Sequence, residues 1–494
     1  MIFSFQAVQQ LCTRLLTEGH VAAAAAVAEA SWHIAGEVGM PPIQVARLLA
    51  APVVAAVDCG RAPAVAAVQR LLFGARMQAL LVWLLVEIIE GMERPDAAAA
   101  TALEVLGEEG GAVLNGDLSA LLTADGHHRA AAALSRALYD QASSLGQEQE
   151  VAAALAAGIA QAAQAGSVED AVAVQWLLFE QGQTEVLRGT LAALTGWPAG
   201  AAAAGRLSWH AIETDRESLV AATSLTLLLA GQAHEAAAAL EALAAASGQQ
   251  DRVARVAAAV MVDAVDGGAA AAVAAANAQL WGCGLTPLLR DTMACAARQG
   301  WADAAAKVSR QALQQGHGGM VADVAAALIV EGAVEESAQL AAHLAMAANF
   351  SSAAIQASLS GPPAAALSAA MAAAVQCGGA SHAAAVAAEL LHEGHQELLA
   401  DVSAHMVASG HAGELAQLAA AALALELPHS KITLSELSGL LSRTVQEFSD
   451  GGSAGDGMPA RAIARAARQP PGGRQEEGLK QLSHDLVATS GDTA

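Results

Sequence analysis

The chain has 494 residues, of which 55% are hydrophobic, 15% are charged and 3% are aromatic. A chain this apolar is not broadly disordered, and because a single core seldom exceeds roughly 250–300 residues, we expect several domains or an elongated array. The net charge of −24 repels phosphate backbones and anionic membrane surfaces, which argues against nucleic-acid binding without excluding a local basic groove.

The N-terminal stretch MIFSFQAVQQLCTRLLTEG lacks the basic region and the uninterrupted apolar core of a secretory signal. Because it has one arginine and no acid before Glu18, a weak mitochondrial-type presequence stays open. The most apolar window, residues 79–91, is interrupted by Glu87 and Glu90 and falls short of the ~20 residues of a membrane span. We expect one buried helix there and no membrane insertion. The five cysteines form no C-x-x-C pair, which suits free thiols in a reducing compartment.

One sequence pattern recurs along the chain: a glycine, then acids or small residues, then an apolar run rich in alanine. Glycine permits the left-handed conformation that closes a helix, and acids in the following first turn favour the positive end of the next helix dipole. We therefore expect turns of helical hairpins at Gly19, Gly60, Gly91, Gly126, Gly166, Gly231, Gly300 and Gly332, with looser copies at Gly394 and Gly410. A degenerate copy at Gly200 would fill the gap between Gly166 and Gly231.

The copies are spaced by about 31–41 residues, close to the ~34 of two-helix repeats. Alanine is the best helix former, and its small side chain lets helix axes approach closely. The sequence thus predicts an all-α chain, an α-solenoid of stacked antiparallel helix pairs. The alternative is an alanine-rich helical bundle in which the glycine-containing pattern recurs by chance.

Two copies, EGAVEESAQLAAHLA at 331–345 and GSVEDAVAVQWL at 166–177, resemble the inter-helix turn and second helix of tetratricopeptide repeats and of their pentatricopeptide relatives. The resemblance covers about residues 10–425. It implies an α-solenoid whose concave surface binds peptides or proteins in the first family and RNA in the second. Most copies lack the aromatic that starts the first helix and the proline that closes each tetratricopeptide unit, so the peptide-clamp residues are not carried over. The RNA-reading relatives would also need basic grooves.

Prolines punctuate the chain within residues 39–44, 196–200, 360–367 and 425–433. We expect a helical-repeat array over residues 1–448, with breaks near 197 and 361. Residues 433–448 carry leucines at helical spacing and predict a final capping helix. Residues 449–494 are rich in glycine and proline and predict a disordered tail. The tail carries three arginines at helical spacing, Arg461, Arg465 and Arg468. They could form a short cationic helix that docks on the chain's own acidic surface, on a partner or on RNA, or they could simply keep the tail soluble.

Common enzyme motifs are missing: the sequence contains no G-x-x-x-x-G-K-[ST] loop and no G-x-S-x-G elbow. One histidine cluster could ligate a metal together with Glu393 and Glu397; it consists of His392, His395, His405 and His411. Because Gly394 separates the first two histidines where a turn is expected, we favour a solvated loop, and His127 and His128 occupy an equivalent turn.

Adjacent carboxylates occur as Glu108–Glu109, Glu169–Asp170 and Glu335–Glu336. Neighbouring residues point in different directions on a helix, so we favour helix-start charge over shared acid–base chemistry. The seven tryptophans are expected to fill gaps left by alanine. Trp301, which directly follows a repeat glycine, is the best candidate for an exposed interaction anchor.

These observations predict a non-catalytic scaffold that binds other proteins within a larger assembly. We expect no catalytic, cofactor-binding or metal-binding residues, no cofactor and no small-molecule substrate. The alternative is an organellar RNA-binding helical-repeat protein, and a third hypothesis is a metal enzyme that uses the histidines of 392–411. We expect a cytoplasmic location. Composition alone suggests a ciliary or cytoskeletal complex, and organelle import stays open.

Overall fold

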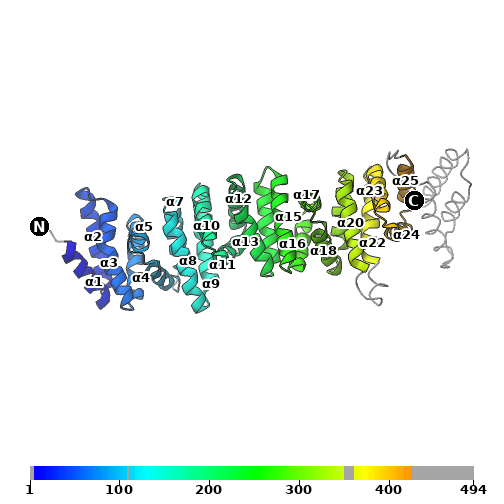
Figure 1. Ribbon diagram of the computed structural model, residues 1–494. Coiled ribbons are helices and arrows are strands. Elements are labelled where there is room, and N and C mark those ends of the chain that lie inside the picture. Colours follow the sequence, from blue (N-terminus) through cyan, green and yellow to red (C-terminus); the bar gives the residue numbers. More distant parts are fainter. Residues whose placement is uncertain (1–4, 108–110, 350–360, 425–494) are drawn as a thin grey trace, which may run out of the picture. The chain divides into compact units, whose positions relative to one another are not determined.

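The computed structural model describes residues 5–107, 111–349 and 361–424, and Figure 1 shows that they are built of helices. These residues form 24 α-helices and one π-helix and contain no strand, which confirms the all-α prediction. The expected capping helix at 433–448 and the tail at 449–494 lie outside the described residues. The chain divides into two compact units, Met1–Gln249 and Gln250–Ala494; the breaks expected near 197 and 361 stay predictions.

Most helices in both units are 12 to 18 residues long. In the first unit they are α1 (Phe5–Glu18), α2 (Val21–Glu37), α3 (Pro42–Asp58), α4 (Ala62–Gly74), α5 (Gln78–Val86), the π-helix η1 (Glu87–Gly91), α6 (Pro95–Leu106), α7 (Gly111–Ala124), α8 (His128–Leu145), α9 (Glu148–Gln164), α10 (Val168–Glu180), α11 (Thr184–Thr195), α12 (Pro198–Glu213), α13 (Glu217–Leu229) and α14 (Ala233–Ala246).

In the second unit the described helices are α15 (Gln250–Asp266), α16 (Ala270–Gly282), α17 (Thr286–Arg298), α18 (Ala302–Gln314), α19 (Gly318–Val330), α20 (Val334–Asn349), α22 (Gly361–Gln376), α23 (Ala380–His392), α24 (Gln396–Ala408) and α25 (Ala412–Ala424).

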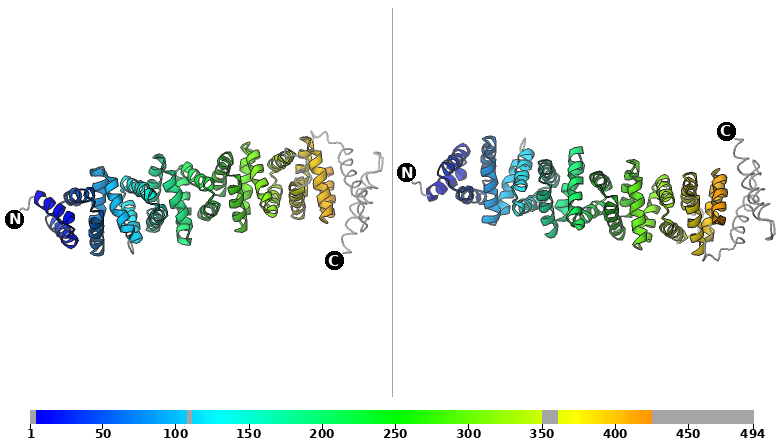
Figure 2. Two further views of the ribbon diagram at one scale, coloured as in Figure 1. Left: turned by 90° about the horizontal axis from the view of Figure 1, so that it is seen from below. Right: turned by 90° about the horizontal axis from the view of Figure 1, so that it is seen from above.

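Within each unit the helices form two layers (Figure 2). A helix packs against its neighbour in the chain and, as a rule more extensively, against the helix two positions further: α1 on α3 and α2 on α4 in the first unit, α15 on α17 and α16 on α18 in the second. The alternation continues with α19 on α22 and α20 on α23. Stacked antiparallel helix pairs of this kind define the α-solenoid class, as the sequence predicts.

The helices are joined by short turns that repeat one geometry. Gly300 has a φ of +81°, its N–H donates to the carbonyl of Ala297, and the N–H of Trp301 donates to the carbonyl of Ala296. The left-handed conformation at this position is the reason for glycine. In the second unit the left-handed glycines of the described residues follow one another every 16 residues in two series: Gly268, Gly284, Gly300, Gly316 and Gly332, then Gly378, Gly394 and Gly410. Two helices joined by equivalent turns therefore form a 32-residue repeat, within the spacing of about 31–41 residues expected from the sequence.

The predictions are wrong for two of the expected turn glycines, Gly91 and Gly200. Gly91 ends η1, and the left-handed residue of that turn is Glu93, with a φ of 55°. The stretch from Gln78 to Glu93 is one residue longer than the equivalent stretch from Thr286 to Gly300, and the wider turn of a π-helix absorbs one extra residue.

Gly200 lies inside α12, where a Cβ would meet the ring of Trp197. The turn that follows α12 instead uses Asp215, with a φ of 58°.

The core consists mainly of alanine, leucine and valine, and in places the helices approach too closely for any side chain. A Cβ on Gly158 of α9 would lie 2.7 Å from the carbonyl oxygen of Gly116 on α7. On α12, a Cβ on Gly205 would collide with the carbonyl oxygen of Ala242 on α14. Real Cβ atoms do not come that near a backbone oxygen, so glycine permits these crossings.

Candidate functional site

The histidines that suggested a metal site lie at opposite ends of α24. His392 is the last residue of α23 and His395 caps the start of α24, whereas His405 lies in the last turn of α24 and His411 precedes α25. His405 follows His395 by ten residues, so at ~1.5 Å of rise per residue α24 separates the two pairs by roughly 15 Å. The four therefore do not share one site. Over the described residues, no group of three His, Cys, Asp or Glu side chains is placed to hold a metal ion.

The carboxylate pairs serve separate contacts with other helices. Glu336, in the first turn of α20, lies 3.3 Å from Nε of Arg298. Asp170, in the first turn of α10, lies 2.9 Å from Nε2 of His128. The side chains of Glu108 and Glu109 lie outside the described residues. Where described, these pairs start helices, as expected, and one member of each pair also bridges to a neighbouring helix.

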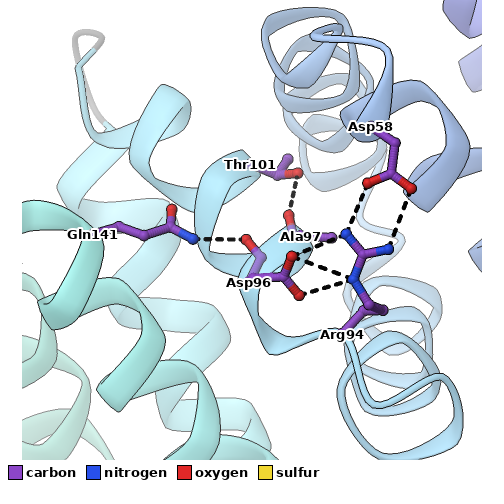
Figure 3. Close-up of polar contacts among 6 residues, drawn as sticks. All are labelled: Asp58, Arg94, Asp96, Ala97, Thr101 and Gln141. Carbon is purple, nitrogen blue, oxygen red and sulfur yellow. Dashed lines mark hydrogen bonds and ion pairs between the residues drawn. The ribbon is translucent and has the colours of Figure 1, made fainter.

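A polar cluster lies between α3, α6 and α8 (Figure 3). Arg94 precedes α6 and donates from Nη2 to Asp58 at 2.8 Å and from Nε to Asp96 at 2.9 Å. The backbone carbonyl of Asp96 accepts a hydrogen bond of 2.9 Å from Nε2 of Gln141 on α8. Because Arg94 donates to both carboxylates, it lowers the pKa of Asp58 and of Asp96. The cluster links α3, α6 and α8, and both of its carboxylates are paired with Arg94.

Similar bridges recur in both units, between residues 41 to 44 positions apart in the sequence. In the first unit, Arg188 donates from Nη1 to Oε1 of Gln232 at 2.8 Å. In the second, Arg290 donates from Nη1 to Glu331 at 2.6 Å, and the indole N–H of Trp281 donates to Asp323 at 2.9 Å. These polar side chains thus join helices that stack on one another.

The basic side chains are dispersed among acids. Eight of those described lie in ion pairs with carboxylates of the same chain: Arg14, Arg47, Arg94, Arg136, Arg188, Arg290, Arg298 and Lys307. Another, Arg216, lies 5.4 Å from the ring centroid of Trp176, within the range of a cation–π contact. An RNA-binding groove needs basic side chains gathered and free for phosphates, and most of these have protein partners.

The seven tryptophans are all half-buried. Trp301 caps α18 and is half-buried as well, so the expectation of an exposed anchor at this residue is wrong. Three others contact neighbouring helices: Trp83 lies 5.1 Å from His127 between ring centroids, Trp176 lies under Arg216, and Trp281 donates to Asp323. Sequence reasoning instead missed the large apolar side chains that are exposed in the described residues: Leu11, Ile34, Val38, Leu71, Val113, Leu145, Leu229 and Val330.

One cavity of the second unit is lined mainly by apolar side chains of α17, α19 and α20. It also meets Asn277, whose amide nitrogen is buried and has no hydrogen-bond partner among the described residues. With a volume of about 30 Å³, the cavity has room for one or two water molecules and not for a substrate.

In comparisons with known proteins, no family model matches the chain and no curated protein has significant sequence similarity to it. The class to which the chain belongs, a helical-repeat protein of the α-solenoid type, therefore stands on the fold. Within the described residues, no helix is both long enough and apolar enough to cross a membrane.

Proposed function

We propose that the chain is a non-catalytic scaffold, a tetratricopeptide-like helical-repeat subunit that binds other proteins within a larger assembly. One contrast carries this proposal. Titratable side chains such as Arg94 and Asp170 are engaged between helices, while eight large apolar side chains of the described residues are exposed. Exposed apolar side chains are the groups that protein partners cover.

The outer faces of the helices also suit close contact with a partner. On α9, the residues exposed along one side are small or uncharged, as at Ala153, Ala157 and Gln161. Alanine loses no side-chain entropy when it is covered, so such a face favours a broad contact of modest energy per residue. A few larger side chains would then supply most of the affinity.

The charge distribution favours a protein over RNA as the partner. Eight basic side chains of the described residues are paired internally, and the whole chain has a net charge of −24. A phosphate backbone would have to compete with those carboxylates, and its binding would weaken steeply with salt. The proposed location stays the cytoplasm, with a ciliary or organellar assembly as the alternative.

Affinity capture of the full chain from its own cells, with and without nuclease, tests the proposal. We expect the same proteins to co-purify in fixed proportion after nuclease treatment. Recovery of RNA, together with loss of the partners after nuclease treatment, would instead establish the RNA-binding alternative.

A further inference from the structure

Exposed apolar side chains gather at the start of the first unit. Ile34 and Val38 belong to the last turn and the C-cap of α2 and are 60% and 68% exposed, and Leu71 on α4 is 48% exposed. Side chains of this size are normally buried in a helical stack. Three of them on two helices mark a place where the chain alone leaves apolar surface in water.

The three side chains lie on the outer sides of two helices that pack together. On α2 the inner side is formed by buried alanines such as Ala28 and Ala35, and Ile34 follows Ala30 on the opposite, exposed side. On α4 the buried side includes Val68 and Leu72, while Leu71 faces outward. Because α2 packs on α4 in the same layer, their outer sides form one surface, the α2–α4 face.

Small residues make this face suitable for a helix. Ala30 on α2 and Ala67 on α4 are exposed and half-exposed, respectively, between the larger side chains. Small side chains allow a helix axis to approach to the short end of the ~8–10 Å range. Apolar groups spaced by one helical turn, as Ala30, Ile34 and Val38 are, match the anchor spacing of a helix laid into a groove.

The α2–α4 face carries two free basic groups against one free acid, although the whole chain has a net charge of −24. The acid is Glu37 on α2, which is exposed and has no ionic partner among the described residues. Arg61 caps the start of α4 and Arg76 follows its end; both are exposed, and neither pairs with a carboxylate of the described residues. Two basic groups without an ionic partner among the described residues therefore lie at the two ends of the helix that carries Leu71.

We propose that the α2–α4 face docks an amphipathic helix of a partner protein, whose apolar stripe covers Ile34, Val38 and Leu71 and whose flanking carboxylates meet Arg61 and Arg76. This inference rests on the proposed scaffold function and specifies an acidic amphipathic helix as one partner. Charge complementarity selects an acidic helix, because a basic helix would face the two arginines and gain nothing from them.

The test uses the full chain and a fluorescein-labelled helical peptide with a leucine stripe flanked by glutamates, followed by fluorescence anisotropy. We expect saturable binding, weakened at least tenfold by the double substitution Ile34→Glu and Leu71→Glu. The matched control, Leu145→Glu with Leu229→Glu, changes exposed apolar residues of the same unit and should bind as the wild type does. Arg61→Gln with Arg76→Gln should weaken binding and flatten its dependence on salt.

Three outcomes would overturn the proposal: equal binding by both glutamate pairs, equal or tighter binding of a peptide with lysines in place of the glutamates, or no saturable binding. A dimer of the full chain in sedimentation that Ile34→Glu with Leu71→Glu dissolves would also overturn it, because the occupant would then be a second copy. Circular dichroism of each variant establishes that it is folded.

Failure of this site and failure of the scaffold function are distinguishable. If the Ile34→Glu and Leu71→Glu variant still captures the same proteins from cells, the scaffold function stands and this face is not the site. If the wild type captures none, the scaffold function itself fails.

Discussion

The glycine at the crossing of α12 and α14 gives the sharpest test of the packing. In Gly205→Ala, the added Cβ would collide with the carbonyl oxygen of Ala242. A backbone carbonyl cannot swing aside as the end of a side chain can, so the two helices must separate. Overpacking of this kind costs about 1–3 kcal/mol, and we expect the upper half of that range here.

Alanine partly offsets this cost, because it is favoured over glycine in a helix by about 0.8–1.0 kcal/mol. The net destabilisation by Gly205→Ala should then be about 1–2 kcal/mol. The control Gly36→Ala, on α2, adds a Cβ that meets nothing within 4 Å and should be neutral or stabilising by up to about 1 kcal/mol.

The assay is native-state hydrogen exchange followed by mass spectrometry, because a repeat protein of this length need not unfold in one step. We expect faster exchange in peptides of α12 and α14 in Gly205→Ala and unchanged or slower exchange in α2 in Gly36→Ala. Slower exchange of α12 and α14 in Gly205→Ala would refute the close crossing of these helices.

Further predictions concern the turns, the π-helix and pH. Gly300→Ala should destabilise the second unit by about 1–2 kcal/mol, because Gly300 has a left-handed backbone conformation. Glu93 has the same conformation, so Glu93→Gly should stabilise the first unit. Denaturant midpoints measure both effects, and opposite signs would contradict the turn geometry. Deleting Glu90 should convert η1 to regular α-helix and leave the circular dichroism and melting temperature near those of the wild type. As a control, deleting one residue within the regular helix α17 should lower the melting temperature sharply. Because Arg94 lowers the folded-state pKa of Asp58 and Asp96 below their ordinary value of 3.8, their contribution is present above that pH and lost as the pH falls below it. The melting temperature of Arg94→Gln should therefore fall less than that of the wild type on acidification from pH 7, and an equal fall would show that the cluster adds nothing.

The turns could be predicted because their chemistry is local. A left-handed residue that closes a helix is usually glycine, so turns such as those at Gly300 and Gly332 can be recognised in the sequence. Acids such as Glu336 then follow in the first turn of the next helix. Where Glu93 or Asp215 takes the left-handed position, the signal is lost. The glycines expected at these turns, Gly91 and Gly200, instead lie inside helices.

The exposed surface could not be predicted because alanine occupies both sides of the helices. On α2, Ala24 and Ala25 are buried whereas Ala23 and Ala26 are exposed, so the sequence lacks the apolar–polar contrast from which an outer face is normally read. For the same reason Ile34 could not be assigned to the outside. The ion pair of Arg94 with Asp58 joins residues 36 apart, and only the stacking of the repeats brings them together.

Native mass spectrometry of the assembly purified from cells through a tag on the full chain tests the central claim most directly. The scaffold account predicts that the chain appears in a whole-number ratio with other proteins, with no mass left over for nucleic acid. A chain recovered alone, or a complex whose added mass is RNA, would contradict it.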